Sequence, residues 1–265
     1  MKKAYPIDPF MTRGAGFTLT ELLVVIVMLG ILGALILPAL AGTKPNSAAF
    51  QCLQNQRQMV RAWQMYADDN GGTLVASLGQ SGTGYYNTRP VWMTGNVQTS
   101  PYSWDVNTLT NSPLYAYLGK NLSIFKCPAD PTTWTIAGTA YPSVRSISMS
   151  QVFDFGQWLP ASKYRTYGKL TEIVKPANTL VFIDENPKFM NDGAFATECD
   201  PSAKDIVDLP ATYHDKAAGL SFADGHAELH KWSGPLILIG SGNLAFSSAD
   251  INDWSYLANN STVLK

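Results

Sequence analysis

The hydrophobic and polar positions of this chain follow three successive patterns, and the first is a continuous apolar run. From Leu22 to Leu37 no residue is charged or strongly polar. Residues 17–40 together are about as long as the roughly 20-residue helix that spans a bilayer. One acid, Glu21, stands at the start of the run, where a carboxylate costs about 2.5 kcal/mol or more in lipid unless it is paired. The pattern predicts a membrane helix over residues 17–40.

A helical period continues beyond this run in a more polar segment. Between Ser47 and Ala67 apolar residues recur at steps of three and four, and Gln, Asn and Arg fill the opposite face. This spacing is typical of an amphipathic helix that rests on a globular domain. The Asp-Asp-Asn-Gly-Gly stretch at 68–72 is expected to end it. Residues 41–72 are therefore predicted to continue the first helix, although Pro38 and Pro45 leave a separate second helix open.

Residues 73–265 have the third pattern, short apolar runs between turn residues, which predicts a β-rich globular domain with long loops. Thr179–Asp184 has the pattern of a central strand, and Ser123–Cys127 and Arg145–Phe153 are further strand candidates. Ser112–Gly119 is expected to form a helical turn.

A hairpin is predicted at residues 219–230, where alternating residues flank Asp224-Gly225. A two-residue turn of the I′ kind needs positive φ at both central residues. Pairing Ala223 with His226 then sets Leu220 opposite Leu229 and gives the hairpin one apolar face. His214 lies one short connection upstream, and we expect its ring to contact the Asp224 carboxylate.

The residues that begin the apolar run, GFTLTE at 16–21, resemble the class III signal of type IV prepilins and type II secretion pseudopilins. The resemblance implies cleavage between Gly16 and Phe17 by a prepilin peptidase, which also N-methylates Phe17. It further implies that Glu21 directs assembly, with other pilin or pseudopilin subunits as partners. Gly30 and Pro38 fall where many pilin helices carry Gly and Pro.

This resemblance implies a pilin-like α+β fold, in which the long N-terminal helix packs on an antiparallel β-sheet with long loops. Residues 1–16 would be the leader, residues 17–40 the membrane and filament-core helix, residues 41–72 its amphipathic continuation, and residues 73–265 the periplasmic or extracellular domain. The protein would pass once through the inner membrane, with its N-terminus in the cytoplasm, and then enter a pilus or pseudopilus filament. Lys2, Lys3 and Arg13 in the leader agree with that orientation.

A second resemblance concerns the C-terminal half. His214 followed after nine residues by Asp224-Gly225 is similar to the H-X9-DG region of many large prepilin-like proteins. The segments FKCPAD at 125–130 and DE at 184–185 resemble parts of the same group. The group is known mainly by sequence, so this likeness implies architecture rather than a reaction.

Other interpretations of the N-terminus and of the function are kept open. Ala39-Leu40-Ala41 offers a secretory small-x-small cleavage site, and an uncleaved anchor is a further possibility, but neither accounts for Glu21. In function, the alternative to a filament subunit is a membrane-anchored module that binds a carbohydrate or another ligand, with stacking surfaces at Trp92, Trp104 and Trp158.

Composition excludes several classes of function. The chain has 19 basic and 20 acidic residues and no basic run beyond the N-terminus, which argues against nucleic acid as a partner. It carries no G-x-S-x-G turn, no phosphate-binding Gly loop and no H-E-x-x-H. We therefore do not expect an enzyme.

Three cysteines allow one disulfide. In the oxidising periplasm we expect it between Cys52 and Cys127. Cys199 is an equally available partner, so two buried free thiols are the alternative. No cofactor is expected, and a metal is only weakly indicated. Calcium would take loop carboxylates, and zinc would take imidazoles with carboxylates. The candidate ligands are Asp184, Glu185, Asp192, Asp208, His226 and His230.

Overall fold

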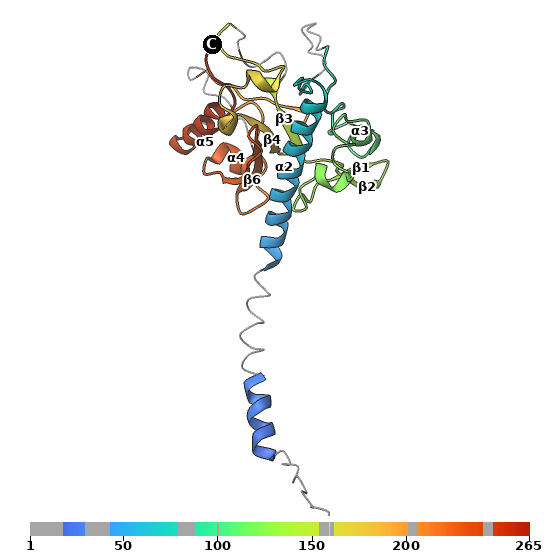
Figure 1. The fold of residues 1–265 in the computed structure, drawn as a ribbon, viewed down its shortest axis with the longest axis vertical. Helices are drawn as coiled ribbons and strands as arrows, with labels where there is room; N and C mark the ends of the chain where they lie inside the picture. Colours follow the sequence, from blue (N-terminus) through green and yellow to red (C-terminus); the bar gives the residue numbers. More distant parts are fainter. Residues whose placement is uncertain are drawn as a thin grey trace, which may run out of the picture. The chain divides into compact units, whose positions relative to one another are not determined.

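The computed structural model describes residues 18–29, 43–78, 88–99, 101–153, 159, 162–200, 206–240 and 246–265. The chain divides into two compact units, residues 1–44 and 45–265. In the first unit residues 19–29 are helical (Figure 1). Within the described ranges, no helix is both long and apolar enough to cross a bilayer. The predicted positions Gly16, Phe17, Gly30 and Pro38 lie outside the described residues.

The helix at 19–29 begins with a reciprocal cap. The backbone N–H and the hydroxyl of Thr18 donate to Glu21 Oε2 at 2.8 and 2.7 Å, and the N–H of Glu21 donates to Thr18 Oγ1 at 3.3 Å. A Thr followed three residues later by Glu is the capping-box pattern of a helix start. Glu21 therefore has a local structural role in addition to the role that the prepilin resemblance implies.

Helix α2 is Thr43–Asp69, and the second unit contains it from Pro45 onward. Its buried side includes Met59, Val60 and Trp63, whereas Met65 is half exposed, so the predicted amphipathic helix is confirmed. The helix stops where expected, because the Gly72 N–H returns to the Ala67 carbonyl and the glycines at 71 and 72 take positive φ.

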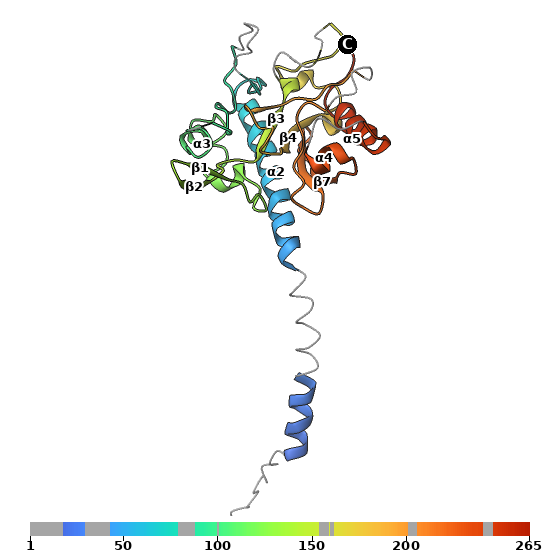
Figure 2. The same ribbon diagram turned by 180° about the vertical axis from the view of Figure 1, so that it is seen from behind.

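A five-stranded sheet lies against α2 (Figure 1), with strand order β5-β3-β4-β6-β7. The strands are β3 Ile147–Ser150, β4 Leu180–Asp184, β5 Ala194–Phe195, β6 Ala217–Phe222 and β7 Ala227–Lys231. All neighbours pair antiparallel except β3 and β5, which are parallel. The fold is thus α+β as predicted, but its main sheet is mixed rather than purely antiparallel. A separate ribbon joins β1, Thr133–Ile136, to β2, Thr139–Pro142 (Figure 2).

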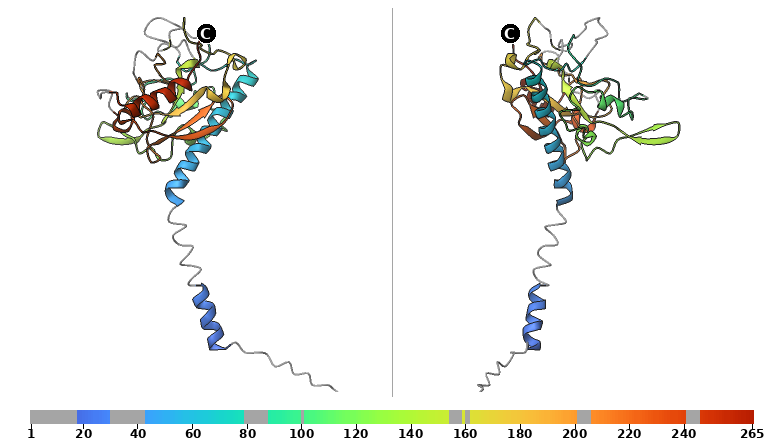
Figure 3. Two further views of the ribbon diagram at one scale, coloured as in Figure 1. Left: turned by 90° about the vertical axis from the view of Figure 1, so that its left-hand side faces the viewer. Right: turned by 45° about the vertical axis from the view of Figure 1, so that its right-hand side comes forward.

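The sheet is covered on both faces. Phe182 belongs to the same apolar cluster as Trp63 of α2, whereas its neighbour Ile183 belongs to a second cluster with Leu257. Leu257 lies on α5, Ser248–Asn259, which packs with α4, Pro235–Ile239, on the face opposite α2 (Figure 3). Short helices complete the unit: α3 Asn107–Thr110 and the 3-10 helices Leu122–Phe125, Gln151–Phe153, Leu170–Glu172 and Pro176–Asn178.

The structure confirms two of the predicted strand regions and contradicts a third. Thr179–Asp184 is confirmed as the central strand β4, and Arg145–Phe153 contains β3 before turning into a 3-10 helix. The predicted strand Ser123–Cys127 is wrong, because residues 122–125 form a 3-10 helix. Asn121 accepts the Ser123 N–H on its side chain and so starts that turn.

The hairpin is confirmed, but its register is wrong by one residue. Leu220 pairs with Glu228 rather than Leu229. The Gly225 N–H donates to the Phe222 carbonyl, and Gly225 alone of the turn has positive φ, so the loop has three residues rather than two. The Ala223 N–H donates to the carbonyl of Thr179, the residue before β4, so a contact with a neighbouring segment helps to hold the longer loop.

Candidate functional site

Four side chains from four separate segments converge beneath α2. Cys52 comes from the middle of α2, Cys127 from the loop after the 3-10 helix Leu122–Phe125, Asp184 from the end of β4, and His214 from the connection into β6. One sulfur, nitrogen or oxygen atom from each residue lies within 4.8 Å of those of the other three. In the part of the chain that the structure describes, this is the one group of three or more such ligands so arranged.

Two short contacts organise the cluster. Cys127 Sγ lies 3.1 Å from His214 Nε2. The Cys52 thiol donates to Asp184 Oδ2 at 2.8 Å. Cys52, Cys127 and Asp184 are buried, whereas His214 is half-buried.

Backbone and hydroxyl groups hold the carboxylate in place. The Gly219 N–H donates to Asp184 Oδ2 at 3.2 Å, and the Ser146 hydroxyl donates to Asp184 Oδ1 at 3.3 Å. Ser146 Oγ also accepts the Cys127 N–H at 2.7 Å. Ser146 thus links two members of the cluster.

The close approach of α2 depends on Gly219 in β6. A Cβ at this position would meet Cys52 Sγ at 2.8 Å, Asp184 Oδ2 at 2.9 Å and Gln56 Cγ at 3.1 Å. Real Cβ atoms essentially never show separations under 3.0 Å, so the first two contacts would force a shift. The absence of a side chain at Gly219 therefore leaves the space that the sulfur and the carboxylate occupy.

The cluster carries a mixture of charge and proton sites. Contact with the Cys52 thiol and with the His214 ring lowers the pKa of Cys127 well below its usual value, against the opposing effect of burial. Burial works to lower the pKa of His214, but the Cys127 sulfur outweighs it and raises that pKa. Burial raises the pKa of Asp184 to about 7.

The outer side of the cluster borders a surface hollow of about 530 Å³. Cys127 is one of its lining residues, although only 1 % of that residue is exposed. The other lining residues are Gln51, Asn55, Ser123, Lys126, Pro128 and Asp130.

The arrangement differs from that of a nucleophilic cysteine. A Cys–His pair of that kind has a third group that orients the imidazole. Here Asp184 accepts hydrogen bonds from Cys52, Ser146 and Gly219 rather than from His214. The carboxylate and the second sulfur instead join the imidazole as further ligand atoms around one point, which is the arrangement of a metal-binding set.

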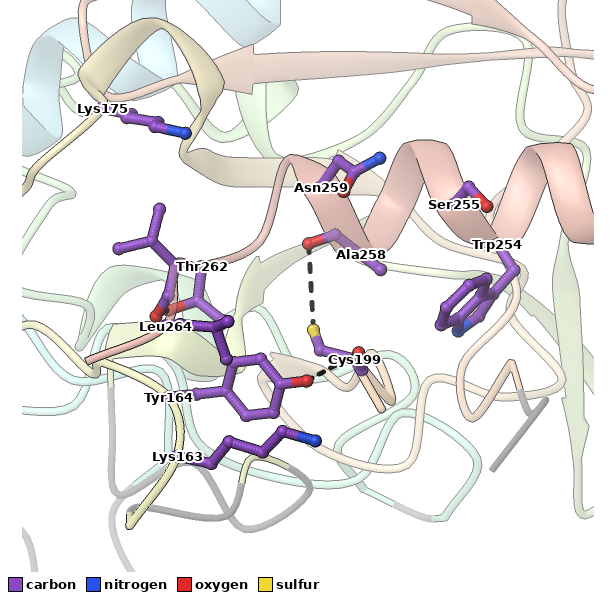
Figure 4. Close-up of a pocket in the computed structure, with 11 residues that line it drawn as sticks. Lys163, Tyr164, Lys175, Cys199, Trp254, Ser255, Ala258, Asn259, Thr262 and Leu264 are labelled. Carbon is purple, nitrogen blue, oxygen red and sulfur yellow. Dashed lines mark hydrogen bonds between the residues drawn. The ribbon is translucent and has the colours of Figure 1, made fainter. Parts of the chain in front are cut away.

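The predicted disulfide between Cys52 and Cys127 is not present. The two residues do meet, as predicted, but all three cysteines are free thiols in the structure. Cys199 lies elsewhere, with its sulfur against the carbonyls of Thr197 and Ala258. It lines a separate hollow of about 660 Å³ together with Tyr164 (Figure 4).

The predicted contact between His214 and Asp224 is wrong. Asp224 Oδ1 instead lies 2.6 Å from His226 Nδ1, across the hairpin turn. The reason is the strand between them, because His214 precedes β6 and Asp224 follows it. Six extended residues span about 20 Å, so the two side chains lie at opposite ends of β6.

The remaining metal candidates do not gather at one point. Asp184 and Glu185 point to opposite faces of the sheet, as expected for neighbours on a strand. Glu185 is fully buried near Arg145 and Asp208, and burial raises its pKa well above the usual value. Asp184 therefore belongs to the cysteine cluster and not to an oxygen-only calcium site. The Asp192 side chain instead accepts the Ala194 N–H at 2.7 Å.

The two histidines of the hairpin are also separate. His226 stacks on Phe222 and pairs with Asp224, whereas His230 stacks on Tyr256 beside Trp232. They do not belong to the ligand group, so a zinc site built on this pair is wrong.

Two of the three tryptophans proposed as ligand-stacking surfaces lie in the described part of the chain, and both contact other residues of the protein. Trp92 is fully buried, with its Nε1–H donating to the Gly193 carbonyl at 2.7 Å. Trp104 is half-buried and stacks on Tyr141. Trp158 lies outside the described residues. Trp92 therefore serves the core, which weakens the ligand-binding alternative.

Comparison with known proteins finds no matching family model, no matching curated protein and no matching solved structure.

Local sequence pattern indicates a role for each of the four members but does not combine them. It places Asp184 among other acids, His214 beside the hairpin, and Cys52 with Cys127 as a disulfide pair. Two cysteines, one histidine and a carboxylate ending a buried strand are a possible soft-metal set. The four residues are far apart in the sequence, so no local pattern indicates that they come together.

Proposed function

We propose that this protein is a structural subunit of a type IV pilus-like or type II secretion pseudopilus filament. A prepilin peptidase would cleave between Gly16 and Phe17 and methylate the new N-terminus. The N-terminal helix would hold the protein in the inner membrane before assembly and would then pack in the core of the filament. The supporting motif is GFTLTE at 16–21, followed by the long apolar run.

One structural observation supports this proposal most directly. The large apolar side chains from Leu19 to Leu29 are 45–80 % exposed, and they occur on every side of the helix. A helix that is apolar all round requires an apolar environment. Lipid before assembly, and the same helices of other subunits afterwards, would supply that environment.

Processing can be tested directly. The protein is co-expressed with a prepilin peptidase, and the mature chain is examined by mass spectrometry. We expect N-methyl-Phe17 at the N-terminus, and we expect Gly16→Leu to block cleavage because the peptidase needs a small residue there. A mature chain that begins at Met1 or after Ala41 would contradict the proposal.

The role of Glu21 needs two variants, because its carboxylate also caps the helix through Thr18. Glu21→Gln keeps a capping-box residue but removes the charge, whereas Glu21→Val removes both. If Glu21 neutralises the Phe17 amine of a neighbouring subunit, both variants should be inserted and cleaved yet enter filaments poorly beside the wild type. Normal incorporation of Glu21→Gln would show that only the cap matters.

A further inference from the structure

We infer that Cys52, Cys127, Asp184 and His214 together bind one zinc ion. This inference is independent of the proposed filament function, because all four residues belong to the second unit. The site would take two sulfurs, one imidazole nitrogen and one carboxylate oxygen.

The spacing of the ligand atoms fits a tetrahedral ion. Zinc lies about 2.3 Å from sulfur and about 2.0–2.1 Å from nitrogen. Tetrahedral geometry therefore places ligand atoms about 3.3–3.8 Å from one another. The sulfur of Cys127 and Nε2 of His214 are 3.1 Å apart, and all four atoms lie within 4.8 Å. Shifts of about an ångström or less would complete the coordination shell.

The donor types select the metal. Two thiolates and an imidazole favour zinc and other soft or borderline ions, whereas calcium and magnesium take oxygen ligands. Four protein ligands around a tetrahedral ion leave no open position, which is the mark of a structural site rather than a catalytic one. The Cys52 thiol would give up its proton on binding, as thiol ligands do.

The surroundings are also those of a built site. Ser146 and Gly219 both donate hydrogen bonds to Asp184, and a Cβ at Gly219 would fill part of the space. Outer partners of this kind orient metal ligands. The ion would tie α2 to the end of β4, to the loop after Phe125 and to the start of β6.

The test uses the full chain in detergent, stripped of metal with a chelator and kept reduced. Cobalt(II) is titrated in as a spectroscopic stand-in for zinc. We expect the visible absorption of tetrahedral cobalt with thiolate charge transfer, saturating at one ion per chain and bleached by zinc. The thermal midpoint should rise with zinc, because an ion that binds only the folded state stabilises it.

Three variants assign the ligands. Cys127→Ser and His214→Gln should each weaken binding about tenfold or more, whereas Cys199→Ser should bind like the wild type because its sulfur lies elsewhere. Circular dichroism of the metal-free variants checks that each remains folded. If Cys127→Ser fails to fold, His214→Gln still tests the site, because it leaves both thiols in place and should change the cobalt spectrum.

Several results would overturn the inference. One is a reduced wild-type protein that gives no tetrahedral cobalt spectrum. Another is a spectrum that His214→Gln leaves unchanged or that Cys199→Ser abolishes. A third is protein exported without reductant that carries a Cys52–Cys127 disulfide and no zinc by native mass spectrometry.

Discussion

Replacing Gly219 by alanine tests whether α2 and the sheet are as closely apposed as the structure indicates. The new Cβ would lie 2.8 Å from Cys52 Sγ and 2.9 Å from Asp184 Oδ2, where ordinary contacts begin at 3.4 Å. Both atoms belong to a buried pair joined by a 2.8 Å hydrogen bond, so neither can move away without breaking that bond or shifting the helix.

The expected cost follows from opposing effects. Overpacking a well-packed interior costs about 1–3 kcal/mol, and losing the Cys52–Asp184 hydrogen bond adds about 1 kcal/mol. Alanine leaves the unfolded chain less conformational entropy than glycine does, and this effect stabilises the folded variant by about 0.4–1 kcal/mol. We therefore expect Gly219→Ala to lower the free energy of unfolding by about 2 kcal/mol.

The assay is urea unfolding of the metal-free chain, followed by tryptophan fluorescence from buried side chains such as Trp63. Gly168→Ala is the matched control, because a Cβ there meets only ordinary contacts at 3.8 Å or more and its φ needs no glycine. The double variant Cys52→Ala/Gly219→Ala should recover about 1 kcal/mol, because one of the clashing atoms is then gone. Equal stability of Gly219→Ala and Gly168→Ala would refute the reasoning.

Two further predictions concern buried carboxylates on the other side of the sheet. Burial raises the pKa of Asp208 to about 7, so the folded state holds a proton that the unfolded chain releases above about 4. The Asp208 proton should therefore contribute a fall in stability of up to a few kcal/mol between about pH 4 and pH 7, and Asp208→Asn should make the wild-type slope shallower. Asp184 and Glu185, whose pKa values burial also raises, contribute to the rest of the slope. Identical pH profiles of the two proteins in chemical unfolding would contradict this assignment. Asp250 accepts the N–H groups of Leu236 and Ser247 at 2.9 and 2.8 Å. Asp250→Ala should cost about 2–4 kcal/mol in unfolding free energy because it leaves buried donors unpaired. Asp250→Asn, which keeps an acceptor, should cost less, and an equal loss in both variants would count against the cap.

Much of the local structure could be predicted because it depends on neighbours in the sequence. The period of the apolar residues predicted α2, and the run Leu180–Asp184 predicted the central strand. Turn residues at 68–72 and around Asp224 marked the helix end and the hairpin. The strand expected at Ser123–Cys127 failed because the Asn121 side chain starts a 3-10 turn there.

The hairpin shows where local pattern stops being sufficient. Both candidate registers place Asp224 and Gly225 in the turn. In the three-residue loop that forms, Ala223 bonds Thr179 through its N–H and Gln64 of α2 through its carbonyl, and both partners are distant in the sequence. A slip of one residue changes which side chains face each other. Leu220 consequently lies opposite Glu228.

The candidate metal site was decided entirely by tertiary structure. The sequence by itself supplied the residue types, and the alternation along a strand predicted that Asp184 and Glu185 point to opposite faces of the sheet. It could not show that β6 separates His214 from Asp224 and turns His214 toward Cys127. Ligands separated by 132 positions, as Cys52 and Asp184 are, meet only because Gly219 lets a helix lie directly on the sheet, and no local pattern in the chain encodes that approach.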